Sequence, residues 1–261
     1  MQSKDVPKFE DKILSLDFLV FSSHKTATQS ITHSLNTKRN KARHCHDLRN
    51  INIKEGDFAS YLEQYLERNN KKLQVISVFR EPIERHISSF FQGYGTRPLR
   101  QKKVENESQT IIYKKSVSDL QKIFYNELSK KKLIGYRESI DIICDELKID
   151  AKELAYNPKK QYGVYESELI KLYVFRFDLI INNFTKLLSK ATGRRVKQKN
   201  ANLSDVKWYK DIYSEFKSTL DMPKKVIVDV YRDKNDLINL FYNEGSAAKL
   251  DQMLTKYTKG S

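Results

Sequence analysis

The sequence predicts an α/β fold, a mainly parallel sheet flanked by helices, with a helical C-terminal portion. Short apolar runs alternate with longer amphipathic segments, and this alternation is typical of strands joined by helical crossovers. The 261 residues suffice for one large domain with a sizeable core. Apolar residues make up 39% of the chain and aromatic residues 11%, a composition that excludes a disordered protein.

Four apolar runs are predicted strands, and the segments between them supply helices. The strands are expected at Leu14–Ser22, Ala42–Asp47, Leu73–Phe79 and Leu172–Phe177. The helices are expected at Thr28–Asn36, Asp57–Asn69, Pro82–Phe91, Val117–Leu147 with a break near Gly135, Leu179–Ala191, Asp205–Leu220 and Lys224–Tyr242. Glycines and basic residues predict a mobile lid or substrate-facing loop at Gly93–Gln109, and a second loop at Gly193–Asn202.

These elements predict a single domain over residues 1–261. We expect its binding core at 14–92 and 172–200, with mostly helical additions at 93–171 and 201–261. Cys45 and Cys144 lie far apart and form no CxxC pair, which argues against a disulfide framework or a zinc cluster. The first residues contain no signal-peptide core, and no apolar stretch is long enough to cross a bilayer. We therefore expect a cytoplasmic protein.

The charge of the chain is strongly unbalanced. Lys and Arg number 48 against 33 for Asp and Glu, a formal net charge of +15. Such an excess attracts anions, so phosphorylated cofactors, anionic glycans, nucleic acid and a peripherally contacted acidic lipid surface are all candidate partners. The alternative interpretation is a solvated, lysine-rich surface without a specific partner.

The most informative segment is Phe21–Ile31, with the sequence FSSHKTATQSI, which follows a predicted strand and opens a predicted helix. Unpaired N–H groups and the helix dipole favour an anion at such a turn. Lys25 adds a positive charge, and the hydroxyls of Thr26, Thr28 and Ser30 add donors. The segment lacks the glycines of the GxxxxGK[ST] loop that binds ATP, so it suits a phosphosulfate better than a triphosphate with Mg²⁺. The alternative is a polar helix cap that happens to contain lysine.

A second segment, Val75–Phe91, reads VISVFREPIERHISSFF. It places Arg80 at the end of a strand and Ser88 within the following helix, where both can bind one phosphate. Together the two segments resemble the cofactor-binding segments of sulfotransferases that use 3′-phosphoadenosine 5′-phosphosulfate (PAPS). HKTATQSI is similar to the PKTASTSF-like loop of the uronyl 2-O-sulfotransferases, and FREPIERHISSFF is similar to their RDPIERxxSxYY segment. His24 replaces the usual proline, and Gln29 replaces a hydroxyl residue.

The resemblance implies a P-loop-like fold and a cofactor site. It assigns the 5′-phosphosulfate to Lys25, Thr26, Ala27, Thr28, Gln29 and Ser30, and the 3′-phosphate to Arg80 and Ser88. A narrower likeness links Lys199–Phe216 to the end of a bacterial family of capsular polysaccharide synthesis proteins, through Lys207, Trp208 and Tyr209. It implies that Lys199 and Asn200 lie in a loop closing over the cofactor. For Trp208 and Tyr209 we favour simple core packing.

Sulfuryl transfer to a hydroxyl needs a general base, and the sequence offers a pair of histidines. His44 and His46 flank Cys45 in RHCHDL, and alternate residues of a strand share a face. The pair resembles the HxH pair of the 2-O-sulfotransferases, and His46 is preferred because Asp47 adjoins it. HxH also occurs in metal sites, but no third ligand is marked, so we expect no metal. His33 and His86 fall inside predicted helices, and Glu166 and Asp178 are weaker candidates.

The sequence therefore predicts a sulfotransferase that moves a sulfuryl group from PAPS to a hydroxyl, with adenosine 3′,5′-bisphosphate (PAP) as product. The acceptor implied by the resemblance is a carbohydrate, and the basic loops suggest an anionic one. A nucleotide-dependent kinase is the alternative enzyme, although no glycine lies between Ser22 and Leu35. A basic nucleic-acid-binding module is the alternative outside enzymes. The main lysine and arginine clusters of this chain contain no aromatic residue, so no stable nucleic-acid complex is expected.

Overall fold

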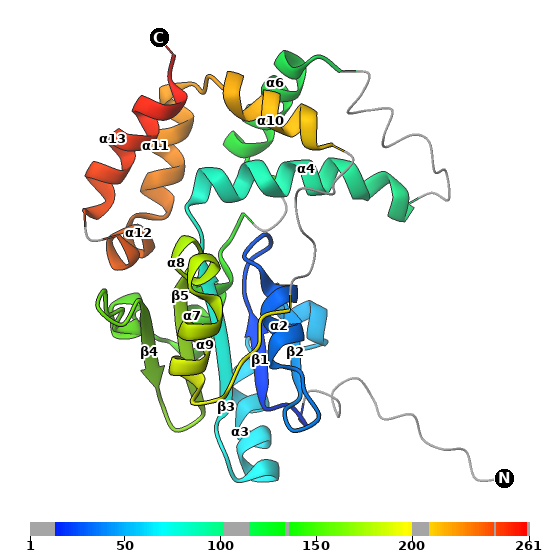
Figure 1. Ribbon diagram of the computed structural model, residues 1–261, viewed down its shortest axis with the longest axis vertical. Coiled ribbons are helices and arrows are strands. Elements are labelled where there is room, and N and C mark those ends of the chain that lie inside the picture. The colour runs from blue at the N-terminus through cyan, green and yellow to red at the C-terminus, as the bar shows by residue number, and fades with distance from the viewer. Residues whose placement is uncertain (1–13, 102–114, 134–135, 200–208, 243, 260–261) are drawn as a thin grey trace, which may run out of the picture. The chain divides into compact units, whose positions relative to one another are not determined.

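The computed structural model describes residues 14–101, 115–133, 136–199, 209–242 and 244–259 (Figure 1), with only the main chain described over 93–101. They form two compact units. The first comprises the described parts of Met1–Arg80 and Arg137–Ala201, and the second those of Glu81–Tyr136 and Asn202–Ser261. None of the described helices combines the length and the apolar character needed to cross a membrane.

The first unit contains a five-stranded sheet in the order β2-β1-β3-β5-β4. The strands are β1 Phe18–Phe21, β2 Ala42–Cys45, β3 Leu73–Phe79, β4 Tyr162–Glu166 and β5 Ile170–Arg176. β1 is parallel to β2 and β3, and β3 is parallel to β5, whereas β4 is antiparallel to β5 at the edge. The predicted mainly parallel sheet is thus confirmed, and each of the four predicted strands overlaps an observed one.

Helices cover both faces of this sheet (Figure 1). They are α2 Thr28–Leu35, α3 Phe58–Asn69, α7 Ser139–Leu147, α8 Phe177–Asn182 and α9 Phe184–Thr192, with short 3₁₀ turns η1 Leu48–Ile51 and η2 Ala151–Leu154. The apolar sides of α2, α8 and α9 pack on Phe18, Val20 and Val78, while α3 and α7 contact β3 from the other face. Every residue of β1 is buried, as expected for a central strand covered twice.

The edge strand β4 is absent from the prediction. Its residues Tyr162–Glu166 are only partly buried, and their short, mixed pattern gives no clear apolar period. Gly163 makes the strand possible, because a Cβ there would lie 2.4 Å from the carbonyl oxygen of Leu154 and 2.7 Å from Val174 Cγ2. The predicted helix at Leu179–Ala191 is instead two helices, α8 and α9, and it ends as expected at Gly193 with a φ of 66°.

The second unit is helical. It consists of α4 Pro82–Gln101, α6 Val117–Ser129, α10 Lys210–Thr219, α11 Lys224–Asp233, α12 Asn235–Phe241 and α13 Gly245–Tyr257. The loop predicted at Gly93–Gln109 is wrong over its first part, because α4 continues to Gln101, and residues 102–109 lie outside the described residues. Gly93, Gly95 and Pro98 all lie within this helix, at a cost of about 1 kcal/mol for each glycine and about 3 kcal/mol for the proline, while Arg, Leu and Gln near its end favour it. Helix α13 was not predicted.

Glu84 ties the start of α4 to two other helices of the second unit. Its carboxylate accepts hydrogen bonds from Lys217 Nζ at 2.7 Å, Lys256 Nζ at 2.5 Å and the Tyr257 hydroxyl at 2.5 Å. Burial alone would raise the pKa of Glu84, but these three donors outweigh it and lower the pKa to about 2. The ionised carboxylate is therefore stabilised by the folded state.

We expect Glu84→Gln to lower the free energy of unfolding by about 3 kcal/mol at pH 7, because it leaves two lysines without their carboxylate. Because the pKa of Glu84 is lower in the folded state, its carboxylate stabilises the fold at pH values above the unfolded pKa of 4.5. This stabilisation is lost as the pH falls toward 2. Urea denaturation at several pH values should therefore show that the free energies of unfolding of wild type and Glu84→Gln become equal near pH 2. The control is Glu215→Gln, an exposed glutamate on α10, and equal stability of wild type and Glu84→Gln at pH 7 would contradict the role.

Candidate functional site

The candidate site lies at the carboxyl ends of the parallel strands. β2 lies on one side of β1 and β3 on the other. The connections after β1 and after β3 therefore lead to opposite sides of the sheet, which makes the boundary between β1 and β3 a topological switch point. Open α/β sheets bind ligands at such a switch point, outside the carboxyl ends of the strands. The segment Ser22–Ala27 leaves β1 here, and Arg80 follows the last residue of β3. The sheet topology therefore brings Ser22–Ala27 and Arg80 to one edge.

Ser22–Ala27, which we call the anion loop, has an unusual main-chain conformation. Lys25 has a φ of 67° and Ala27 a φ of 60°, whereas Thr26 between them and Thr28 after them are not in the left-handed region. Alternating signs of φ turn successive N–H groups toward a common point, which creates a concave anion site. The loop leads directly into α2, whose first-turn N–H groups add to this site.

Left-handed residues other than glycine cost about 1–2 kcal/mol each, so the surroundings must hold the loop in place. Buried hydroxyls do so. Thr26 Oγ1 donates to the Ser23 carbonyl at 2.6 Å and lies 2.8 Å from Ser22 Oγ. Ser22 Oγ in turn accepts the N–H of Val78 in β3 at 2.9 Å. The predicted binding residue Thr26 thus supports the loop from within, while Gln29 and Ser30 are half-buried in the first turn of α2.

Arg80 contacts the anion loop directly. Its Nη1 donates to the Lys25 carbonyl at 3.0 Å, and its guanidinium carbon lies 4.4 Å from the centre of the Phe177 ring. These contacts hold a permanent positive charge beside the loop. Ser88 is buried in α4 and belongs to the second unit, whereas Arg80 belongs to the first.

His46 is placed at the same edge, immediately after β2. Its Nδ1 lies 2.6 Å from the Ser22 carbonyl oxygen, which can only accept, so Nδ1 carries the proton and Nε2 keeps its lone pair. Burial lowers the pKa of His46, the hydrogen bond to Ser22 raises it in part, and the charge of His44 lowers it further. The imidazole is therefore neutral near pH 7, with Nε2 ready to accept a proton.

Two further imidazoles lie beside His46. The His24 ring is 3.8 Å from it, centre to centre, and the His44 ring is 5.5 Å from it. His44 itself is exposed in β2, so His46 is the better enclosed member of the predicted pair. The part of the chain that the structure describes contains no group of three or more His, Cys, Asp or Glu side chains arranged to hold a metal ion.

The other predicted candidates have partners outside the loop, although Asp178 follows β5 at the same carboxyl edge as Arg80. Glu166 forms ion pairs with Lys72 and Lys171, near the amino ends of β3 and β5, so it lies at the opposite edge of the sheet. Asp178 pairs with Arg176. His33 is exposed on α2, and His86 is buried in the second unit with its ring stacked on Tyr136 at 5.1 Å.

The C-terminal likeness is only partly covered by described residues. The Lys199 main chain donates to Ser34 Oγ at 2.8 Å, in the last turn of α2, roughly 9 Å along the helix from Thr28. Asn200, Lys207 and Trp208 lie outside the described residues. Tyr209 is buried, with its ring 5.7 Å from that of Phe91, in agreement with the core-packing interpretation.

Three residues at the site were not predicted. Ser23 Oγ donates to Glu138 Oε2 at 2.6 Å and accepts the Ser139 N–H at 2.9 Å. The Ser139 hydroxyl donates to the His46 carbonyl at 3.1 Å. The only sequence signal was the pattern of a helix start at Glu138, since acidic Asp141 follows three residues later. No family model, no curated protein and no solved structure matches this chain.

Proposed function

We propose that the protein is a PAPS-dependent sulfotransferase with a P-loop-like fold. The observation that carries the proposal is the contact between the anion loop and His46, because it joins an anion site to a neutral imidazole with a free Nε2. In this proposal the anion loop binds a transferable anionic group, and His46 accepts a proton from a hydroxyl. Arg80 supports the assignment, since a cation is the first residue after β3, where a kinase would need a Mg²⁺ ligand. The carboxylate of the next residue, Glu81, caps α4 by accepting the N–H groups of Ile83 and Glu84.

The residues divide the work of an in-line displacement. PAPS, when bound, supplies a sulfuryl group whose bond to the phosphate oxygen breaks as the acceptor oxygen bonds to sulfur. The loop N–H groups and Lys25 bind the 5′-phosphosulfate and stabilise the negative charge that develops on the leaving PAP. Arg80, held beside the loop, binds the 3′-phosphate. His46 Nε2 takes the proton of the acceptor hydroxyl, and its Nδ1–H remains on the Ser22 carbonyl.

The acceptor in this proposal is a carbohydrate that already carries negative charge, in keeping with the net charge of +15. The proposal places the reaction in the cytoplasm, because Cys45 and Cys144 are both free thiols.

Nucleotide binding tests the proposal without knowledge of the acceptor. We expect PAP to raise the melting temperature in the absence of metal, and to bind more tightly than AMP, because two phosphate groups have separate partners. A ligand at a hundred times its dissociation constant stabilises by about 2.7 kcal/mol. Thermal shifts should be compared for PAP, AMP, ATP with Mg²⁺ and single-stranded DNA.

Equal affinity for PAP and AMP would contradict the role of Arg80. Stabilisation by ATP with Mg²⁺ but not by PAP would favour a kinase, and stabilisation by DNA alone would favour a nucleic-acid-binding protein. If PAP binds as expected, transfer of radioactive sulfate from PAPS to a panel of polysaccharides identifies the acceptor class.

A further inference from the structure

The first turn of α7 contacts both halves of the proposed site. Glu138 precedes the helix and accepts a hydrogen bond from Ser23 in the anion loop, while Ser139 opens the helix and donates to the carbonyl of His46. Ser23 is 3% exposed and Glu138 1% exposed, so these bonds are shielded from water and correspondingly strong. A bond from a hydroxyl to a carboxylate at 2.6 Å is of the charge-assisted kind.

These contacts close a ring of hydrogen bonds around the base. His46 Nδ1 binds the Ser22 carbonyl, and the N–H of Ser22 binds the Cys45 carbonyl at 3.2 Å. Ser139 completes the ring, because its N–H binds Ser23 Oγ and its hydroxyl binds the His46 carbonyl. The anion loop and His46 are therefore held by the same two residues, Glu138 and Ser139 at the start of α7, which we call the support.

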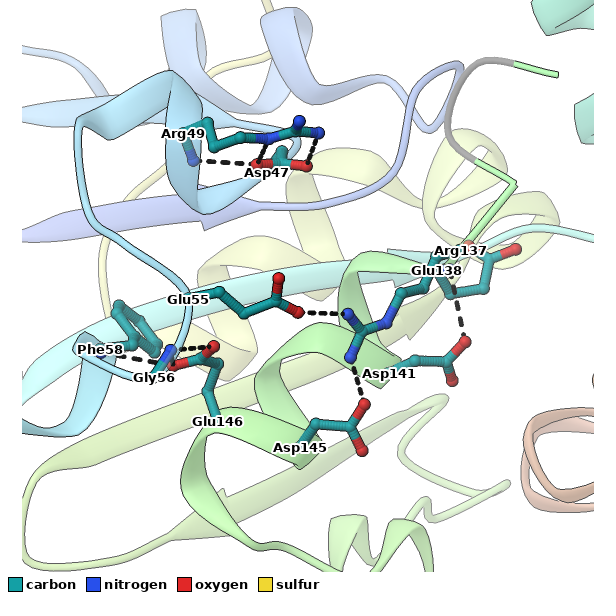
Figure 2. Close-up of polar contacts among 10 residues, drawn as sticks. All are labelled: Asp47, Arg49, Glu55, Gly56, Phe58, Arg137, Glu138, Asp141, Asp145 and Glu146. Carbon is teal, nitrogen blue, oxygen red and sulfur yellow. Dashed lines mark hydrogen bonds and ion pairs between the residues drawn. The ribbon is translucent and has the colours of Figure 1, made fainter. Parts of the chain in front are cut away.

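Ion pairs and caps fix the support itself, as Figure 2 shows. Arg137 reaches Glu55 with Nη1 at 2.9 Å and also binds Asp145, which lies about two turns along α7. Glu146 accepts the N–H groups of Gly56 at 2.8 Å and Phe58 at 3.3 Å, which joins α7 to the start of α3. The first turn of α7 is thereby held against the rest of the sheet unit by contacts that do not involve the site.

We propose that Glu138 and Ser139 are positioning residues with separate tasks, a proposal that rests on the sulfotransferase function above. Glu138 holds the anion loop through Ser23 and so governs affinity for the nucleotide. Ser139 holds the main chain of His46 and so governs the placement of Nε2 on the acceptor hydroxyl. Neither side chain needs to touch PAPS or the acceptor. An error of about 1 Å in the placement of a base can lower a rate by about a hundredfold.

Two neighbouring substitutions separate the two tasks. We expect Ser139→Ala to lower the single-turnover rate by about ten- to a hundredfold with PAP affinity within about threefold of wild type. We expect Glu138→Ala to weaken PAP binding by about tenfold or more, and Glu138→Gln to restore it, because an amide oxygen can still accept from Ser23. Ser214→Ala, an exposed serine that bonds only within α10, is the control and should change neither quantity.

A measurement independent of the nucleotide separates this proposal from the sulfotransferase proposal. In protein labelled with ¹⁵N-histidine, the ring signals of His46, assigned with a His46→Gln variant, should show the Nδ1–H tautomer in the wild type. Ser139→Ala should shift the ring toward a mixture of tautomers, whether or not the protein binds PAP. Failure of the wild type to bind PAP would sink the sulfotransferase proposal and leave this readout intact.

An unchanged tautomer in Ser139→Ala would overturn the role of Ser139. Equal PAP affinity in wild type, Glu138→Ala and Glu138→Gln would overturn that of Glu138. If Glu138→Ala does not fold, as judged by circular dichroism, Ser23→Ala removes the same hydrogen bond from the loop side and must then weaken PAP binding by about tenfold. Normal PAP binding in a folded Ser23→Ala protein would overturn the role of Glu138 as well.

Discussion

Lys25→Ala is expected to lower sulfuryl transfer by about a hundred- to a thousandfold while the protein stays folded. The lysine is the one cation inside the anion loop, and a preorganised positive charge at a leaving phosphate typically contributes a factor of this size. The fold should survive because Lys25 is only half-buried, and because alanine meets the same restriction at a φ of 67° as lysine does. The rate should be measured in a single turnover at saturating PAPS, and folding by circular dichroism.

Lys41→Ala provides the matched control for this substitution. Lys41 is exposed before β2, at the amino edge of the sheet, so its loss removes the same charge at a distance from the loop. A comparable loss of rate in both variants would show that only net charge matters. Normal turnover in Lys25→Ala would remove Lys25 from the mechanism.

His46→Ala is expected to lower the same rate by about a hundredfold or more, with PAP binding retained. His46 has Nδ1 fixed on the Ser22 carbonyl and Nε2 available, and its burial lowers its pKa below the ordinary 6.5. The base acts in its neutral form, so the rate should hold down to a pH below 6.5 and fall only as the pH drops through the lowered pKa. The pH profile of single-turnover transfer tests this.

His44→Ala distinguishes the two histidines of the pair. Because the charge of His44 lowers the pKa of His46, its removal should move the acidic limb of the profile to higher pH, with a small change in the plateau rate. A large loss in His44→Ala with a normal rate in His46→Ala would exchange their roles. Loss of PAP binding in both would assign the pair to the cofactor site instead.

Local patterns predicted those elements whose stability is local or fully apolar. The run Leu73–Phe79 became β3 with the same bounds, and Thr28–Asn36 became α2 with one residue fewer. β4 could not be recognised in the same way, because its place depends on pairing with β5 and on the space left by Gly163. The continuation of α4 beyond Gly93 was missed because Gly93, Gly95 and Pro98 were taken as loop signals, although the helix includes all three.

The site shows the same division between local and distant information. The loop, Arg80 and His46 follow strand ends, and parallel strands bring their carboxyl ends to one edge, so their placement could be predicted from the sequence. The contacts of Glu138 and Ser139 with the loop join residues more than a hundred positions apart, for which the sequence held no pattern. The contact between the His24 and His46 rings was equally hidden, since the two residues belong to different segments, the anion loop and the end of β2.

The hydrogen bond between the Ser22 carbonyl and His46 couples nucleotide binding to the protonation of His46. Ser22 begins the anion loop, and its carbonyl accepts a hydrogen bond from the Nδ1–H of His46. An anion bound in the loop and a proton bound to Nε2 therefore influence each other. An anion nearby favours the imidazolium, and coupling between two binding equilibria is reciprocal. Nucleotide affinity must therefore rise as the pH falls through the pKa of His46, and a binding isotherm recorded across pH reports the ionisation of the base before any acceptor is known.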